Sequence, residues 1–199
     1  MKNTLLYTLI LVVVVMLVVD VVVMFMSKRP YEVVHYEAIY EYGFTDEGTF
    51  TTTTRVMFRK EKYLDKYVET LKNGATDVIE KYFNDLGEKI KRNLKVLSYD
   101  FKTKKIDPQT LEINEVLHLK GAVLIKHEGE KKIYEASLGN IKINAVGDST
   151  VEVVLPKNAK IDSVDPKESE RVVKDGKIIL IWRNGALKTF PKVVYEKVE

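Results

Sequence analysis

The histidines are the first residues to consider for chemistry, because a side chain that titrates near neutral pH can bind a metal or move a proton. The three of them, His35, His118 and His127, are far apart in the sequence and form no His-x-x-x-His pair. Alternation places His35 on the polar side of a predicted strand, and His127 begins a predicted turn. We therefore interpret them as exposed or hydrogen-bonded histidines, not as metal ligands or catalytic bases.

Carboxylates are densest between residues 160 and 171, where Asp162, Asp165, Glu168 and Glu170 supply the oxygen ligands that hard cations prefer. Basic residues lie among them and favour a solvated loop over a cation site. The chain also lacks a P-loop, a Gly-x-Ser-x-Gly motif, a dinucleotide-binding glycine motif and a calcium loop. The sequence thus predicts no catalytic residue, no metal and no cofactor.

A third group consists of Tyr36, Tyr40 and Tyr42, which lie on one side of a predicted strand. A row of tyrosines of this kind could stack against sugar rings. Packing against the apolar side of a helix explains the same spacing, and we favour that interpretation.

The first predicted element of the chain is an apolar run at 4–26. It contains one ionisable residue, Asp20, in 23 positions. As a helix, this run is long enough to cross the roughly 30 Å hydrocarbon core of a bilayer. A cleavable signal peptide has a shorter apolar core followed by small residues, which this run lacks. Residues 1–29 are therefore predicted to be a retained anchor with a transmembrane helix at 4–26, and the lipid bilayer is an expected partner.

Asp20 is the candidate functional residue of this anchor, since ionisable groups inside membrane helices are often functional. It precedes Met26 by six positions, so its side chain could reach toward the headgroups. We favour a tolerated polar residue near the interface. The alternative is an intramembrane contact with a second helix or a partner subunit.

The charges that flank the anchor do not decide its orientation. Lys2 and the amino terminus lie on one side, and Lys28 and Arg29 lie on the other. A very short amino-terminal tail before one long folded region is typical of exported anchored domains. We therefore expect a single-pass protein of the cell membrane with an extracytoplasmic domain.

Composition excludes some classes of partner and site. The chain has 32 Lys and Arg against 29 Asp and Glu, and these charges are interleaved, whereas nucleic acids require a clustered basic stripe. We expect no nucleic acid partner. The absence of cysteine excludes disulfides, thiolate metal sites and a lipoprotein anchor. The abundance of Lys and Glu resembles the composition of hyperthermophile proteins.

Residues 30–103 are predicted to contain a β-hairpin followed by a helical region. Alternation with a period of two marks strands at 31–44 and 50–58. A three-residue loop between them, with Gly48 in the left-handed region, would place Phe44 opposite Phe50.

Apolar residues then recur at helical spacing from residue 60 to residue 94. Asn73 and Gly74 could divide this region into two helices, the second beginning with a capping box at Asp77 and Glu80. One kinked helix that continues through the same position is the alternative, because the apolar phase is not interrupted there.

Residues 104–199 are predicted to be an antiparallel β module that packs with residues 30–103 as one unit. Short alternating strands are separated by turn residues, including Asp175-Gly176 and Asn184-Gly185, which favour type I′ turns. The expected fold class is α+β: one transmembrane helix, then a β-rich domain with a hairpin, one or two helices and an antiparallel sheet or sandwich.

The motifs of residues 151–182 carry a resemblance. A strand ends in Leu-Pro, a Ser-Val-x-Pro turn and an Asp-Gly-Lys hairpin follow, and an apolar strand contains Trp182. This stretch resembles a β module of archaeal envelope proteins. With the anchor and the composition, the whole chain resembles uncharacterised membrane-anchored proteins of hyperthermophilic archaea. The resemblance implies a location and a fold, and it implies no active-site residue.

Together these observations predict a non-catalytic, membrane-anchored extracytoplasmic module that acts by protein or surface contact. The alternative is an accessory or sensing subunit of a membrane complex, in which Asp20 contacts a partner helix. An enzyme whose active site follows no known motif is the third possibility.

Overall fold

The computed structural model describes residues 31–139, 141 and 147–198. The membrane helix predicted at 4–26, with Asp20, lies outside these residues. Within the described ranges, no helix combines the length and the apolar character that crossing a membrane requires.

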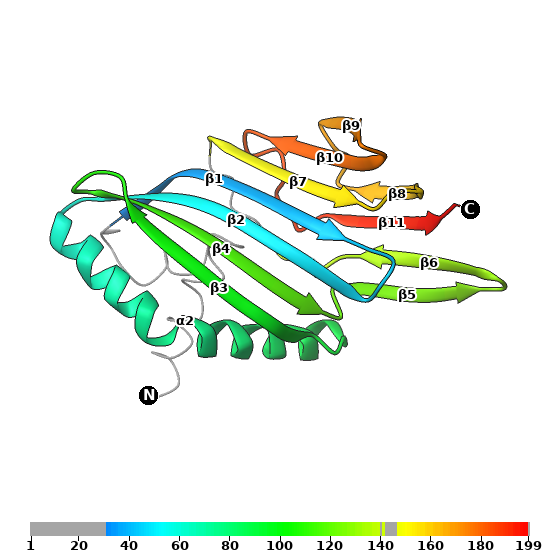
Figure 1. Ribbon diagram of the computed structural model, residues 1–199, viewed down its shortest axis with the longest axis horizontal. Helices are drawn as coiled ribbons and strands as arrows, with labels where there is room; N and C mark the ends of the chain where they lie inside the picture. The colour runs from blue at the N-terminus through cyan, green and yellow to red at the C-terminus, as the bar shows by residue number, and fades with distance from the viewer. Residues whose placement is uncertain (1–30, 140, 142–146, 199) are drawn as a thin grey trace.

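The described residues form one long helix and eleven strands, which are arranged in two sheets (Figure 1). The elements are β1 (Tyr31–Tyr42), β2 (Glu47–Phe58), α2 (Glu61–Ile90), β3 (Lys95–Lys105), β4 (Thr110–Lys120), β5 (Val123–Glu128), β6 (Lys131–Ala136), β7 (Ser149–Leu155), β8 (Ala159–Asp165), β9 (Glu170–Lys174), β10 (Lys177–Arg183) and β11 (Lys192–Lys197). This is the β-rich α+β fold that the sequence predicts.

The larger sheet has seven strands in the order β3-β4-β2-β1-β7-β10-β9, and the smaller has four in the order β5-β6-β11-β8. Among the described strands, neighbours are antiparallel except β1 and β7, which pair in parallel. The strands after residue 104 are therefore shared between the two sheets and do not form a separate antiparallel module. The limit drawn between residues 103 and 104 falls within β3.

The hairpin of β1 and β2 is present, but its predicted register is wrong. Phe50 pairs with Tyr40, and Gly48 pairs with Tyr42. Phe44 leaves the strand, and its ring centroid lies 5.3 Å from that of Tyr134 in the smaller sheet. The register differs from the predicted one by four residues, and an even shift leaves the same side chains on the core face. Alternation therefore cannot distinguish the two registers.

The predicted positive φ of Gly48 is also wrong, since Gly48 is not among the residues in the left-handed region. A Cβ atom at this position would lie 3.0 Å from Cε1 of Tyr42 and 3.2 Å from Cβ of Ala122. Glycine is required here by close packing rather than by turn geometry. The type I′ prediction does hold at Asp175 and Gly176, whose φ angles are 52° and 79°.

The helical region is a single helix of 30 residues, α2, which bends partway along its length (Figure 1). It continues through Asn73 and Gly74, so neither the two-helix alternative nor the capping box at Asp77 is correct. Its N-cap is Lys60, and it ends with Lys91 in the left-handed conformation. The buried side continues across the glycine, because Leu71 and Ala75 are both in the core.

A single core lies between the inner face of the larger sheet, α2 and the smaller sheet. Tyr36, Tyr40 and Tyr42 are only 3%, 0% and 5% exposed, so they pack in this core. The rings of Tyr40 and Phe190 stack with centroids 5.0 Å apart. The alternative of a sugar-stacking tyrosine face is therefore wrong.

Candidate functional site

The histidines lie apart from one another in the fold. His35 Nδ1 is 2.7 Å from the Asp148 carboxylate, and His118 Nδ1 is 3.0 Å from the hydroxyl of Thr49. His127 lies within β5 and does not begin a turn. No group of three or more histidine or acidic side chains among the described residues is placed to hold a metal ion.

The acidic residues of 162–170 are also divided. Asp162 and Asp165 lie on β8 of the smaller sheet, whereas Glu170 begins β9 of the larger sheet. Glu168 accepts a hydrogen bond of 2.8 Å from Arg171 Nε, and Glu170 pairs with an arginine of β10 at 3.3 Å. These ion pairs account for two of the four carboxylates that the sequence places close together.

The most unusual polar group is a carboxyl in the core, which the sequence reasoning missed. Glu115 on β4 is 6% exposed. Tyr99 donates a hydrogen bond of 2.6 Å to its Oε1, and Thr52 donates one of 3.0 Å to its Oε2. Burial raises the pKa of Glu115 to about 6, and the two hydrogen bonds oppose this rise only in part. Glu115 therefore titrates nearer to neutral pH than an ordinary carboxyl does.

A signal for this carboxyl exists in the sequence. Glu115 lies on the inward side of β4, the same side as the buried Ile113 and Leu117, which are two positions before and after it.

Two core hydroxyls near Glu115, those of Thr54 and Tyr67, lack a hydrogen-bond partner. The cluster is enclosed by β2, β3, β4 and α2, so it can hold and release a proton but presents no open face to a substrate.

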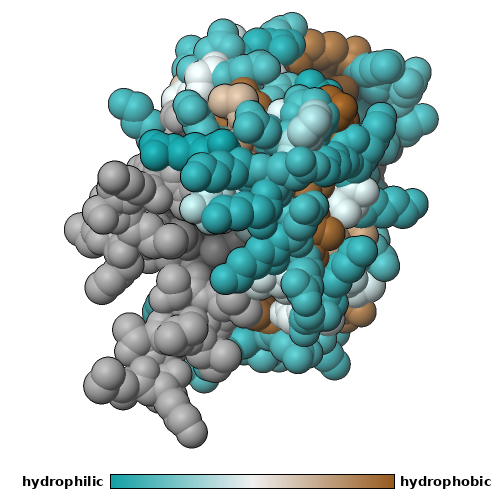
Figure 2. Space-filling view, turned by 90° about the vertical axis from the view of Figure 1, so that its left-hand side faces the viewer, coloured by the Kyte–Doolittle hydropathy of each residue, from teal (hydrophilic) through white to brown (hydrophobic). Residues whose placement is uncertain are grey.

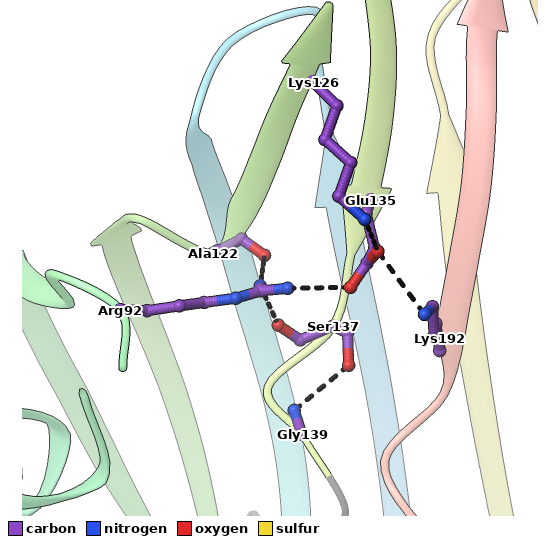
Figure 3. Close-up of polar contacts among 7 residues, drawn as sticks. All are labelled: Arg92, Ala122, Lys126, Glu135, Ser137, Gly139 and Lys192. Atoms are coloured by element: carbon purple, nitrogen blue, oxygen red, sulfur yellow. Dashed lines mark hydrogen bonds and ion pairs between the residues drawn. The ribbon is translucent and has the colours of Figure 1, made fainter. Parts of the chain in front are cut away.

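A second polar cluster ties the end of α2 to the smaller sheet (Figure 3). Arg92 Nη1 donates hydrogen bonds to the backbone carbonyls of Ala122 and Ser137, at 3.3 Å and 2.5 Å. Its Nη2 lies 3.1 Å from Glu135, which also contacts Lys126 at 2.7 Å and Lys192 at 3.3 Å. Burial alone would raise the pKa of Glu135, but the two lysines hold it below its usual value. This cluster joins structural elements.

The outer face of the seven-stranded sheet is the side opposite the core. Side chains of β1, β2, β4, β7 and β10 meet there in register. We define it by Glu37, Ile39, Glu41, Thr49, Thr51, Thr53, Arg55, Glu112, Asn114, Val116, His118, Thr150, Glu152, Val154, Ile179 and Ile181. Hydrogen bonds join neighbouring strands across it, for example from Thr53 to Asn114 at 2.8 Å.

An apolar patch lies near the centre of this outer face. It consists of Ile39, which is 40% exposed, the half-buried Ile179, and Val154 and Ile181, which are only 7% and 5% exposed. Ion pairs flank the patch, including Lys177 with Glu41 at 3.5 Å and Arg55 with Glu112 at 2.8 Å, where the Arg55 hydrogen bond lowers the pKa of Glu112. Beside it, at the β1–β2 turn, a shallow cleft of about 280 Å³ is lined by residues that include His118 and Lys177.

Comparison with solved structures gives only distant likenesses. The M1 zinc metallopeptidase from Deinococcus radiodurans is 10% identical, with a TM-score of 0.36 over 84% of this chain and 42% of that one. The folded domain of Mycobacterium tuberculosis LppM is 11% identical, with a TM-score of 0.36 over 87% of this chain and 97% of that one. This chain thus spans about two fifths of the peptidase. Likenesses of this degree identify no activity.

No curated protein sequence matches the chain significantly. A protein family does match, over residues 31–196, which include α2 and all the described strands up to the next-to-last residue of β11. The chain therefore belongs to the family described as Domain of unknown function (DUF4897).

Proposed function

We propose that this chain is a non-catalytic module, anchored to the cell membrane by residues 4–26, which binds a partner protein outside the cytoplasm. The observation that carries the proposal is the outer face of the seven-stranded sheet. The opposite side of the same sheet is covered by α2 and the rest of the core, whereas the outer face leaves Ile39 40% exposed.

The composition of the outer face matches what protein partners bind. Interfaces between proteins combine an apolar centre with a polar rim that supplies hydrogen bonds. Here Ile39 supplies the exposed apolar centre, and the flanking ion pairs Arg55–Glu112 and Glu41–Lys177 supply the rim. The cross-strand hydrogen bonds hold the rim side chains in place before binding, which reduces the entropy that binding must overcome.

Membrane attachment is supported by the sequence alone. The apolar run at 4–26 has the length of a transmembrane helix.

The proposal is tested by changing Ile39 to Glu in the full-length chain. Cross-linking in native membranes, followed by purification of the chain, should yield a defined partner with the unchanged protein and none with Ile39→Glu. Leu124→Glu is the matched control, since Leu124 is 39% exposed but lies in the smaller sheet. Both variants should keep the melting temperature within a few degrees of the unchanged protein. A partner that Ile39→Glu retains would contradict the proposed surface.

A second candidate function is an accessory subunit of a membrane complex, which the position of Asp20 in an apolar run favours. The same cross-linking experiment distinguishes it. A partner that is lost on Asp20→Leu but kept on Ile39→Glu would indicate that the contact is made within the membrane.

A further inference from the structure

The distance between the predicted anchor and the folded domain is short. Strand β1 begins at Tyr31, five residues after Met26, where the apolar run ends. Five residues of fully extended chain span at most about 18 Å. If residues 4–26 cross the bilayer, as the proposed function requires, the start of β1 is held within this distance of the end of the membrane helix.

Several elements meet at the start of β1, which lies at the left-hand end of the molecule in Figure 1. Tyr31 pairs with Phe58 at the end of β2, and the backbone N–H of Phe58 donates a hydrogen bond of 2.7 Å to the carbonyl of Gln109 in the β3–β4 turn. Lys105 at the end of β3 contacts Glu61 in the first turn of α2 at 2.6 Å. The short connection therefore brings all four elements near the bilayer.

This end of the domain exposes apolar side chains that have no role in the core. Met57 is 43% exposed, Ile106 is 46% exposed and Tyr63 is 37% exposed. They come from β2, the β3–β4 turn and α2. Figure 2 looks onto this end and shows small apolar patches surrounded by long hydrophilic side chains. Apolar and aromatic groups among basic side chains are typical of surfaces that lie in the membrane interface.

Basic residues slightly outnumber acidic residues at this end of the domain, which favours contact with an anionic surface. The basic residues here are Arg59, Lys60, Lys62, Lys104 and Lys105, and the acidic residues are Glu32, Glu61, Asp65 and Asp107. Lys105 and Glu61 pair with each other, and Asp107 accepts backbone hydrogen bonds of 2.8 Å from Gln109 and Thr110. Lys28 and Arg29, in the connection to the anchor, add two positive charges.

We infer that this end is a membrane-docking surface, in which Met57, Tyr63 and Ile106 enter the headgroup region of an anionic bilayer. The surrounding basic side chains that are not paired with acidic residues contact lipid phosphates. Docking would fix the long axis of the domain away from the membrane, with the β5–β6 turn at the far end (Figure 1). The inference rests on the proposed membrane anchor.

The absence of cysteine allows a direct test with single labelled cysteines. The full-length Ile106→Cys and Met57→Cys variants, labelled with an environment-sensitive fluorophore, are placed in vesicles of phosphatidylcholine and phosphatidylglycerol that carry a quencher near the headgroup. Glu130→Cys, in the β5–β6 turn, is the matched control. Labels at 106 and 57 should be quenched roughly threefold more than the label at 130, as expected for side chains in the interface.

Flotation of the same vesicles separates the two ways in which the inference can fail. If the chain floats with the vesicles but the labels at 106, 57 and 130 are quenched equally, the docking surface is wrong and the anchor stands. If the chain does not float, the anchor is wrong, and the inference falls with it. If the label at 106 is quenched equally in vesicles without phosphatidylglycerol, the basic residues have no role in docking. The apolar contact with the bilayer would then remain.

Discussion

At the scale of single residues, Glu115 is the clearest case of a side chain whose environment controls its chemistry. A carboxyl that is 6% exposed, with hydrogen bonds from Tyr99 and Thr52, remains in a core built mainly from apolar and aromatic groups. Burial raises its pKa to about 6, so the folded protein holds a proton that the unfolded chain would release. The stability of the fold must therefore depend on pH through this residue.

The sign of this dependence follows from the raised pKa. The stabilising contribution of the Glu115 proton is complete below the ordinary value of 4.5 and is lost as the pH rises through about 6. A difference of this size corresponds to roughly 2 kcal/mol. We predict that Glu115→Gln removes this loss, so that its free energy of unfolding, relative to the unchanged protein, rises by about 2 kcal/mol between pH 4.5 and pH 7.

Denaturant unfolding across this pH range measures the effect. Glu112→Gln is the matched control, because Glu112 lies on the same strand but on the outer face, and the hydrogen bond from Arg55 lowers its pKa. The control should not reproduce the gain in stability toward pH 7. An unchanged pH profile in Glu115→Gln would show that the carboxyl is not buried in the way described.

At the scale of elements, the sequence predicts which strands and helices exist better than how they are joined. Alternation identifies β1 and β2, but a shift of four residues preserves the core face, and alternation could not show that Phe44 leaves the strand to pack against Tyr134. Asn73-Gly74 carries a helix-stop signal, yet α2 continues because its buried side is uninterrupted. Glu115 could have been found from its inward position in β4. The partners of Arg92 depend on distant contacts that no local pattern contains.

The glycines of α2 give a prediction at this scale. Nothing lies within 4 Å of a Cβ atom built on Gly74, so Gly74→Ala should stabilise the protein by about 0.5–1 kcal/mol through helix propensity. A Cβ atom on Gly87 would lie 2.6 Å from the backbone oxygen of Arg92. Gly87→Ala should therefore destabilise the protein by about 1–3 kcal/mol.

Thermal unfolding of Gly74→Ala and Gly87→Ala measures the two changes in stability, and each variant serves as the control for the other. Opposite shifts of the melting temperature support the packing described for the middle of the helix and for its C-terminal end. A loss of stability in Gly74→Ala would instead indicate that the helix is interrupted there, as the two-helix alternative required.

At the scale of the whole molecule, the two sheets and α2 share one core, and the larger sheet contains strands from both before and after residue 104. A domain built in this way exposes one broad outer face and one end from which the chain leads to residues 4–26. The proposed binding function and the proposed docking surface use these two parts of the molecule. Both require that the domain is held at a membrane, and the proposed binding function also requires that it lies outside the cytoplasm.

Protease accessibility in intact cells tests this requirement most directly. The full-length chain is given a C-terminal tag beyond Glu199, and protease is added to intact cells and to cells whose membranes have been opened. The membrane fraction should retain the chain in alkaline carbonate, and protease should remove the tag from intact cells. A tag that is protected until the membrane is opened would place the domain in the cytoplasm and contradict the account.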